Sequence, residues 1–200
     1  MNGNYRDDIR LSVEDREIYY LYHFTQIVNL PEIMKHGLLS RRKLAELKCL
    51  AYTSDEYRLD ENSDAVSVSI SQVNERMFAS KRRKSGHQDW VVLVLGSKIL
   101  WTHKCQFCWS NAAKKEIKNR RGFRGGPWAF KKMFAGSNES RGNLERCYPT
   151  DPEAEVQVLE NIASKYIVGA IVGRQEMAEP VNDILNELPE WLGVEVIDGF

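Results

Sequence analysis

Residues 153–158 read Glu-Ala-Glu-Val-Gln-Val, and this stretch decides how the rest of the chain is interpreted. Its apolar residues alternate with Glu153, Glu155 and Gln157, which predicts a β-strand with one apolar and one polar face. The two carboxylates then share a face. A glutamate on a strand is often only a solvated side chain, so the importance of Glu155 depends on what surrounds it elsewhere in the sequence.

The bulk properties predict a folded globular protein. The chain has 200 residues, 42% of them apolar and 10% aromatic, which suits one domain over residues 1–200. It has no apolar run of about 18 residues, so no transmembrane helix and no membrane partner are expected. The polar N-terminus and four scattered cysteines favour a reduced, cytoplasmic protein.

The net charge is zero, but the charges are unevenly distributed. Residues 81–132 hold 14 Lys or Arg and two acids, whereas residues 151–200 hold 11 acids and two bases. Tryptophan and phenylalanine are interleaved with the basic residues. Basic and aromatic side chains together can follow a phosphate backbone and stack on unpaired bases. The alternative is that these charges only keep the protein soluble while the aromatic residues fill its core.

The alternation of apolar and polar residues predicts a mixed, α+β fold with long loops over one end. We expect strands at 17–24, 65–70, 90–95, 104–108, 153–158, 166–172 and 194–197. We expect helices at 30–36, 41–48, 71–81, 110–118, 128–134 and 176–188. The predicted loops are 54–64, 119–127 and 136–152.

Several familiar chemistries are excluded by missing motifs. The sequence has no phosphate-binding Gly-Lys-Ser/Thr loop, no Rossmann glycine pattern and no Gly-x-Ser-x-Gly elbow. Cys105 and Cys108 form a Cys-x-x-Cys pair, with His103 nearby and Cys147 farther along. One such pair without a second set is weak evidence for zinc, so we predict no metal site and keep a zinc enzyme as an alternative.

Three segments, taken in order, resemble a known family. They are 22–40, with Tyr-His-Phe-Thr, Asn-Leu-Pro and His-Gly-Leu-Leu-Ser; 107–113, Phe-Cys-Trp-Ser-Asn-Ala-Ala; and 154–158, Ala-Glu-Val-Gln-Val. The series resembles the DarT family of single-stranded-DNA ADP-ribosyltransferase toxins, within the ADP-ribosyltransferase superfamily. The resemblance extends over about residues 18–175. It implies an ADP-ribosyltransferase-like fold, with mixed or antiparallel central sheets, peripheral helices and long substrate loops.

The resemblance also implies NAD as the co-substrate and a role for each matching residue. Glu155 would be catalytic, and Arg76 is the nearest candidate for the arginine of the family. His23 and Thr25 would hold the adenosine-side ribose, and the backbone at Gly37 and Leu38 would meet the nicotinamide amide. The other cofactor-binding candidates are Asn29, Leu30 and Asn111.

Single-stranded DNA is the substrate that the resemblance implies. Arg120, Arg121, Arg124 and Trp128 are the candidate nucleic-acid-binding residues. Asn111 stands where thymine-directed members tend to have a histidine, which favours guanine over thymine as the target base. A toxin of this family implies a toxin–antitoxin system with a macrodomain antitoxin that removes ADP-ribose. The alternatives are a transferase of the same fold acting on RNA or protein, and a non-catalytic nucleic-acid-binding module.

Overall fold

The computed structural model describes residues 4–49, 51–52, 60, 62–86, 89–137 and 141–197, and of Arg121 only the backbone. Its strands form one seven-stranded sheet in the order β4-β5-β2-β1-β3-β6-β7. Neighbouring strands run antiparallel except β6 and β7, which are parallel. The strands are β1 (Tyr20–Gln26), β2 (Val66–Ile70), β3 (Trp90–Gly96), β4 (Cys105–Cys108), β5 (Glu155–Val158), β6 (Ile167–Val172) and β7 (Val194–Val196).

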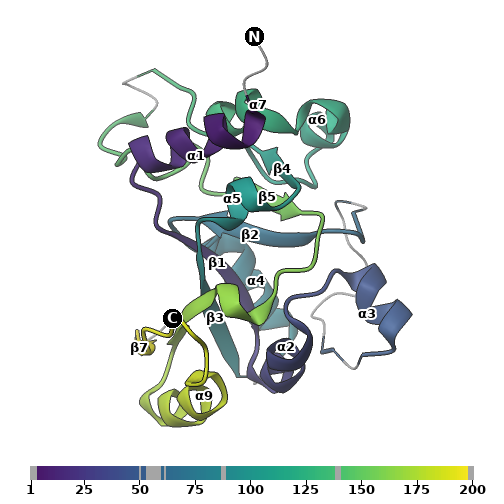
Figure 1. Ribbon diagram of the computed structural model, residues 1–200, viewed down its shortest axis with the longest axis vertical. Coiled ribbons are helices and arrows are strands. Elements are labelled where there is room, and N and C mark those ends of the chain that lie inside the picture. The colour runs from purple at the N-terminus through teal and green to yellow at the C-terminus, as the bar shows by residue number, and fades with distance from the viewer. Residues whose placement is uncertain are drawn as a thin grey trace.

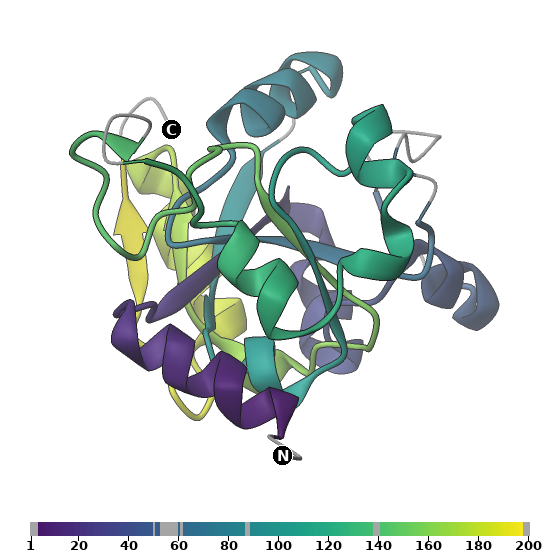
Figure 2. The same ribbon diagram turned by 90° about the horizontal axis from the view of Figure 1, so that it is seen from above.

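Helices surround this sheet (Figure 1). The α-helices are α1 (Tyr5–Asp15), α2 (Leu30–His36), α3 (Arg41–Leu47), α4 (Glu75–Lys84), α5 (Ile99–Thr102), α6 (Lys115–Lys118), α7 (Gly126–Lys132) and α9 (Ala178–Leu185). Short 3-10 turns are η1 (Ile27–Asn29), η2 (Arg121–Phe123), η3 (Ser164–Tyr166) and η4 (Gln175–Met177). Helix α1 packs on α7 and α5 at one end, and α2 packs on α9 at the other (Figures 1 and 2). Within the described ranges, no helix has the length and apolar character needed to cross a bilayer.

The ladder between β1 and β2 is the shortest in the sheet. These strands pair at Leu21–Ile70 and Tyr22–Ser69, and no further pair joins them among the described residues. By contrast, β1 pairs with β3 along its whole length, from Tyr20–Gly96 to Gln26–Trp90. Beyond Tyr22, β1 therefore follows β3 while β2 follows β5, and the two halves of the sheet separate.

Apolar side chains from both halves form the main core. Val156 and Val158 of β5 are fully buried there, as the alternation of residues 153–158 predicted. A second cluster lies between α4 and the sheet, where the rings of Phe24, Phe78 and Trp90 are 5.1–6.0 Å apart. Full burial of a large apolar side chain stabilises a fold by about 1.5–3 kcal/mol, so this cluster attaches α4 firmly to the sheet.

The predicted α+β class is confirmed, and most predicted elements are present with shifted ends. Helix α2 has the predicted bounds of 30–36, and Gly37 ends it with a φ of 76°. The strand predicted at 153–158 begins only at Glu155, and Glu153 lies in the turn before it. Most of the predicted loop 54–64 lies outside the described residues.

One helix was not predicted, and one predicted helix is much shorter. Residues 5–15 form α1, which the polar N-terminus concealed because only Ile9 and Val13 of that helix are buried. The helix predicted at 110–118 is reduced to α6, since residues 110–114 form turns over Glu155 instead.

Gly37 holds a backbone conformation that only glycine adopts easily. A Cβ at this position would lie 2.3 Å from the carbonyl oxygen of Ile162. We expect Gly37→Ala to lower the free energy of unfolding by roughly 2–4 kcal/mol, since backbone strain of about 1–3 kcal/mol adds to this clash. Equilibrium urea unfolding measures the loss. Gly96→Ala is the matched control, because a Cβ there meets open space. Equal losses in the two variants would contradict this account of Gly37.

Candidate active site

A cavity of about 720 Å³ lies where β1 and β2 separate. Its size is within the range of about 300–1,000 Å³ that is common for small-molecule sites. Nearly all the cofactor and catalytic residues predicted from the sequence line it: His23, Thr25, Asn29, Gly37, Leu38, Arg76, Asn111 and Glu155. The fold thus collects residues from the first, middle and last thirds of the chain around one space.

His23 spans the gap between the separating strands. Its Nδ1 lies 2.9 Å from the carbonyl oxygen of Ser67 on β2. A carbonyl only accepts, so Nδ1 carries the proton, and the neutral ring then has Nε2 as its second, accepting nitrogen. This bond fixes both the orientation and the tautomer of the imidazole on the cavity wall.

The Asn29 side chain forms hydrogen bonds with two other residues of the cavity wall, Thr25 and Tyr52. Its amide nitrogen donates to Thr25 Oγ1 and to the Tyr52 carbonyl, each at 3.0 Å. Its Oδ1 accepts from the Tyr52 N–H at 2.9 Å. Asn29 therefore positions Thr25 and joins residues 51–52 to the start of α2.

The structure specifies one of the predicted cofactor contacts and corrects another. The N–H of Gly37 already donates to Ile33, and that of Leu38 donates to Ile162. The Leu38 carbonyl also accepts one hydrogen bond, from the Ile162 N–H at 3.1 Å. A carbonyl oxygen has two lone pairs, so a nicotinamide amide could still meet the carbonyl oxygens of these residues, but not their N–H groups. Leu30 is fully buried in the main core and does not line the cavity, because it faces inward from the first turn of α2.

Glu155 is held at the other side of the cavity. Its side chain is 6% exposed, and Oε1 accepts a hydrogen bond of 2.9 Å from the Ala112 N–H. The turn that supplies this N–H is closed by Asn111, whose Oδ1 accepts from the Ala113 N–H at 2.9 Å. The hydrogen bond fixes the position of one carboxylate oxygen, so the turn holds the Glu155 side chain at the edge of the cavity.

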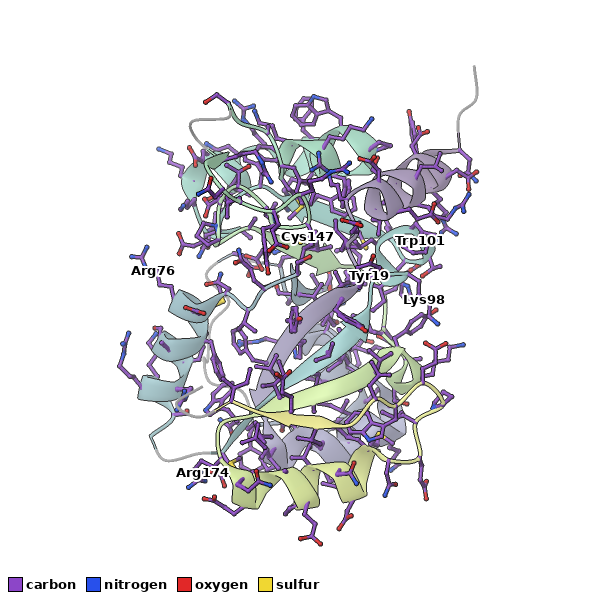
Figure 3. The ribbon with its side chains drawn as sticks, turned by 90° about the vertical axis from the view of Figure 1, so that its left-hand side faces the viewer. Tyr19, Arg76, Lys98, Trp101, Cys147 and Arg174 are labelled. Carbon is purple, nitrogen blue, oxygen red and sulfur yellow. The ribbon has the colours of Figure 1, made fainter. Side chains whose placement is uncertain are left out.

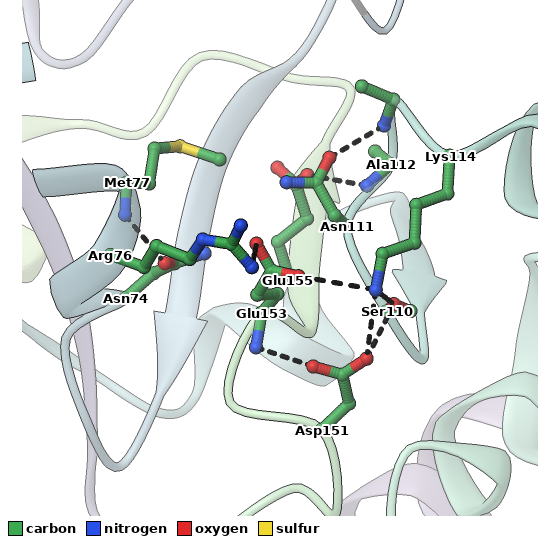
Figure 4. Close-up of polar contacts among 11 residues, drawn as sticks. Asn74, Arg76, Met77, Ser110, Asn111, Ala112, Lys114, Asp151, Glu153 and Glu155 are labelled. Atoms are coloured by element: carbon green, nitrogen blue, oxygen red, sulfur yellow. Dashed lines mark hydrogen bonds and ion pairs between the residues drawn. The ribbon is translucent and has the colours of Figure 1, made fainter. Parts of the chain in front are cut away.

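A polar network supports this turn (Figure 4). Lys114 Nζ lies 2.6 Å from Ser110 Oγ and 3.2 Å from Glu153 Oε2. Asp151 accepts from Ser110 and from the Glu153 N–H. Burial alone would raise the pKa of Asp151, but these hydrogen bonds and the charge of Lys114 outweigh burial and lower that pKa. The network fixes the segment that enters β5.

Arg76 lies at the rim of the cavity, on the first turn of α4. Its side chain is 84% exposed (Figure 3), and its Nη1 lies 3.7 Å from Glu153 Oε1. An exposed ion pair of this kind contributes little to stability. Arg76 therefore lines only the edge of the cavity, and most of its side chain is in solvent.

The structure adds a basic cluster that the sequence analysis did not single out. Arg41 on α3 and Lys81 and Lys84 on α4 line the same cavity. Burial, and after it the neighbouring charges of Lys84 and Arg41, together lower the pKa of Lys81 to about 8. The spacing of Lys81 and Lys84 could have suggested one helix face, but only the fold brings Arg41 to them.

The predicted nucleic-acid-binding residues separate into two groups. Arg120 is exposed, and Trp128 on α7 is 56% exposed, with its ring 5.8 Å from Trp109 in an edge-to-face contact. Arg124 is a correction, because it is 1% exposed and its Nη1 donates to Cys108 Sγ at 3.4 Å. A guanidinium buried in this way does not meet DNA. The side chain of Arg121 lies outside the described residues.

The Cys-x-x-Cys pair is not arranged as a metal site. Cys105 and Cys108 are three residues apart on β4, which directs their side chains to opposite faces of the sheet. Cys105 Sγ donates to the Ile99 carbonyl, whereas Cys108 accepts from Arg124. Burial raises the pKa of both thiols to about 12. They are structural thiols of the interior.

Comparison with solved structures shows the fold. Thermus sp. 2.9 DarT in complex with carba-NAD+ has a TM-score of 0.57 and 16% identity, covering 91% of this chain and 96% of that one. The same DarT in complex with ADP-ribosylated ssDNA has a TM-score of 0.51 and 18% identity, covering 91% and 94%. Thermosipho africanus DarTG in complex with ADP-ribose has a TM-score of 0.56 and 16% identity. The match covers 90% of this chain but only half the length of DarTG.

Sequence comparison gives the family. Comparison with curated proteins gives no match. A family profile described as "ssDNA thymidine ADP-ribosyltransferase, DarT" matches residues 22–196, nearly the whole chain. The resemblance found in the three sequence segments is thereby confirmed, as is the predicted enzyme class. The chain belongs to the DarT family of single-stranded-DNA ADP-ribosyltransferases.

Proposed function

We propose that this protein transfers ADP-ribose from NAD to a base of single-stranded DNA, with Glu155 as the catalytic carboxylate. One observation supports this more than any other. His23 and Glu155, chosen from separate segments of the sequence, line one cavity of a size suited to a dinucleotide. The NAD-bound and ssDNA-bound complexes of Thermus DarT share this fold and agree with the proposal.

The basic cluster is our candidate for the diphosphate site of NAD. Arg41, Lys81 and Lys84 bring three cations to one part of the cavity wall. An anion with two phosphate groups would relieve their mutual repulsion and accept charge-assisted hydrogen bonds from them. His23 and Thr25 then remain for the ribose next to it, and the carbonyl oxygens at Gly37 and Leu38 for the nicotinamide amide.

The reaction requires a carboxylate where we place Glu155. The bond between C1′ of the ribose and nicotinamide breaks, and its electrons leave with nicotinamide while positive charge develops on the sugar. A negative carboxylate stabilises that charge. A ring nitrogen or exocyclic amine of the base then bonds to C1′, and its proton passes to Glu155 as the general base.

For the base we propose thymidine, which the family description names. Guanine is the second candidate, and its support is Asn111, which lines the cavity beside Glu155 where a histidine was expected of thymine-directed members. Both bases carry an N–H that can donate to a side-chain carbonyl such as that of Asn111. A duplex would have to be unstacked at a cost of a few kcal/mol, which favours unpaired DNA.

We also propose a partner, a macrodomain protein that removes ADP-ribose from DNA as an antitoxin. Its support is chemical and comes from family membership. A base that carries ADP-ribose cannot pair normally, so a cell that makes this enzyme needs a hydrolase that reverses the modification. An enzyme of this kind would act in the compartment that holds the DNA, which is the reason for proposing a cytoplasmic location.

Glu155→Gln should lower ADP-ribose transfer by about 10²–10⁴-fold, because the amide neither stabilises the developing charge nor accepts the proton. The substitution keeps the shape of the side chain, so NAD binding should persist. The assay incubates the protein with NAD and four oligonucleotides, each with one reactive base type, and measures their masses. We expect the added ADP-ribose on the thymidine oligonucleotide.

Glu153→Gln is the matched control. It removes a carboxylate two residues away that pairs with Lys114, and transfer should fall by less than about tenfold, as for a supporting surface pair. If Glu155→Gln kept full activity and Glu153→Gln were inactive, the assignment of Glu155 as the catalytic carboxylate would be wrong. If only the guanine oligonucleotide gained ADP-ribose, guanine would replace thymine as the target base.

NAD affinity should fall as pH rises through about 8, because Lys81 loses its charge there. A bound diphosphate raises the pKa of the lysine, so binding is strongest below pH 8 and weakens above it, by roughly twofold to fivefold for a half-buried pair. NAD has no group that titrates in this range. Calorimetric titrations from pH 7 to pH 9 measure the change. Lys81→Arg should flatten the profile, and an unchanged slope in that variant would remove Lys81 from the diphosphate site.

The exposed aromatic and basic residues near α7 should bind the DNA strand. Trp128→Ala should weaken oligonucleotide binding by about 1–3 kcal/mol through loss of stacking. Arg120→Ala should reduce the salt slope by about 0.7 through loss of one phosphate contact. Fluorescence anisotropy at several salt concentrations measures both effects.

Hydrolysis of NAD without DNA should survive in both variants, because neither residue lines the cavity. Arg174→Ala is the control, since Arg174 is a half-exposed arginine far from α7 (Figure 3). If Arg174→Ala lost as much DNA affinity as Arg120→Ala, the DNA would not bind specifically near α7, because any positive surface charge would contribute equally.

A further inference from the structure

A group of metal-ligating side chains lies on the cavity wall away from Glu155. It consists of Glu32 and His36 on α2 and Cys49, two residues after α3. One ligand atom from each residue lies within 4.8 Å of the others. All three side chains are partly exposed, and all three line the cavity. The proposed transfer reaction uses none of them.

The local backbone holds these side chains together. Glu32 and His36 are four residues apart, so they lie on one face of α2, and His36 Nε2 is 3.5 Å from Glu32 Oε2. Helix α3 ends at Lys48 in a left-handed conformation with a φ of 51°. This turns the chain back toward α2, and the Cys49 N–H then donates to the Leu44 carbonyl.

A second contact secures the segment after Cys49. The amide of Asn29 bonds to both the N–H and the carbonyl of Tyr52, and Asn29 directly precedes α2. Cys49 is therefore fixed on one side by α3 and on the other by a pair of bonds to the start of α2. The backbone that carries the three donor residues is thus held in place by contacts that do not depend on a metal.

We propose that Glu32, His36 and Cys49 bind one zinc ion. A thiolate, an imidazole and a carboxylate form a donor set that suits Zn²⁺, whereas Mg²⁺ and Ca²⁺ require oxygen donors throughout. Tetrahedral bonds of about 2.0–2.3 Å place neighbouring ligand atoms roughly 3.3–3.6 Å apart. The distance of 3.5 Å between His36 Nε2 and Glu32 Oε2 matches this already. The Cys49 sulfur lies within 4.8 Å of a ligand atom of each and would move closer when the ion binds.

Three protein ligands leave the fourth zinc position for water or for a group inside the cavity. When the ion binds, the S–H bond of Cys49 breaks, the sulfur bonds to zinc and the proton goes to solvent. No electron is transferred. The ion would connect α2 to the segment after α3 and so brace one wall of the cavity. This inference goes beyond the proposed function and does not depend on it, because the ligands serve no step of the transfer.

Spectroscopy of cobalt binding tests the site directly. The full chain, reduced and freed of metal, is titrated with Co²⁺ and then with Zn²⁺. We expect one ion per chain, with the intense near-ultraviolet absorption of a thiolate–cobalt bond, displaced by one equivalent of Zn²⁺. Cys49→Ser should abolish this absorption, and His36→Gln should weaken Zn²⁺ binding by at least about tenfold, as for a lost ligand.

Cys147→Ser is the matched control, since Cys147 is another partly exposed free thiol that belongs to no such group among the described residues. It should keep both the absorption and the affinity. Circular dichroism of each variant checks that the fold is retained. Absence of the thiolate absorption in the wild-type protein, or its survival in Cys49→Ser, would overturn the proposal. Equal Zn²⁺ affinity in wild-type and His36→Gln protein would overturn it as well.

Discussion

The separation of β1 from β2 is the constraint on which the site depends. Leu21 and Tyr22 hold the strands together for two residue pairs, and then each strand follows its other neighbour. Backbone groups freed by a splitting sheet must find other partners, or burial becomes costly. His23 meets this need at Ser67, since its ring nitrogen donates to a carbonyl that no longer faces β1. One imidazole thus closes the gap in the sheet and forms part of the cavity that the gap creates.

Burial of its polar face fixes β5, the strand that carries the proposed catalytic glutamate. Glu155 and Gln157 share that face, and both are buried. Gln157 is satisfied by Asp60 and Asn62, at 2.6 and 2.8 Å. Glu155 receives the Ala112 N–H, and the turn that offers it is fixed by the network of Ser110, Lys114 and Asp151. A buried carboxylate with a fixed donor has little freedom to reorient, which is what a reaction that builds charge at one atom requires.

The basic segment 114–132 serves two purposes that its composition does not distinguish. Arg120 and Trp128 are exposed and available to DNA, whereas Arg124 is among the largest fully buried side chains. The carbonyl of Arg124 accepts from Phe107 at 2.7 Å, which draws the loop onto β4. Its Nε has no hydrogen-bond partner among the described residues. This buried cation lies against Cys108, which is paired with Glu155 in the sheet, so the loop is anchored beside the residue that pairs with Glu155.

The sequence by itself determined the strand periodicity, the capping of α2 by Gly37 and the family, because these depend on local spacing and on short ordered motifs. It therefore named Glu155, His23, Thr25 and Asn111 as candidates, and all four line the cavity. Only the tertiary structure decided that Leu30 and Arg124 turn inward, that Arg41 joins Lys81, and that Cys49 meets Glu32 and His36. The physical reason is that burial and charge proximity depend on which distant segments pack together, and a strand or helix period carries no information about that partner.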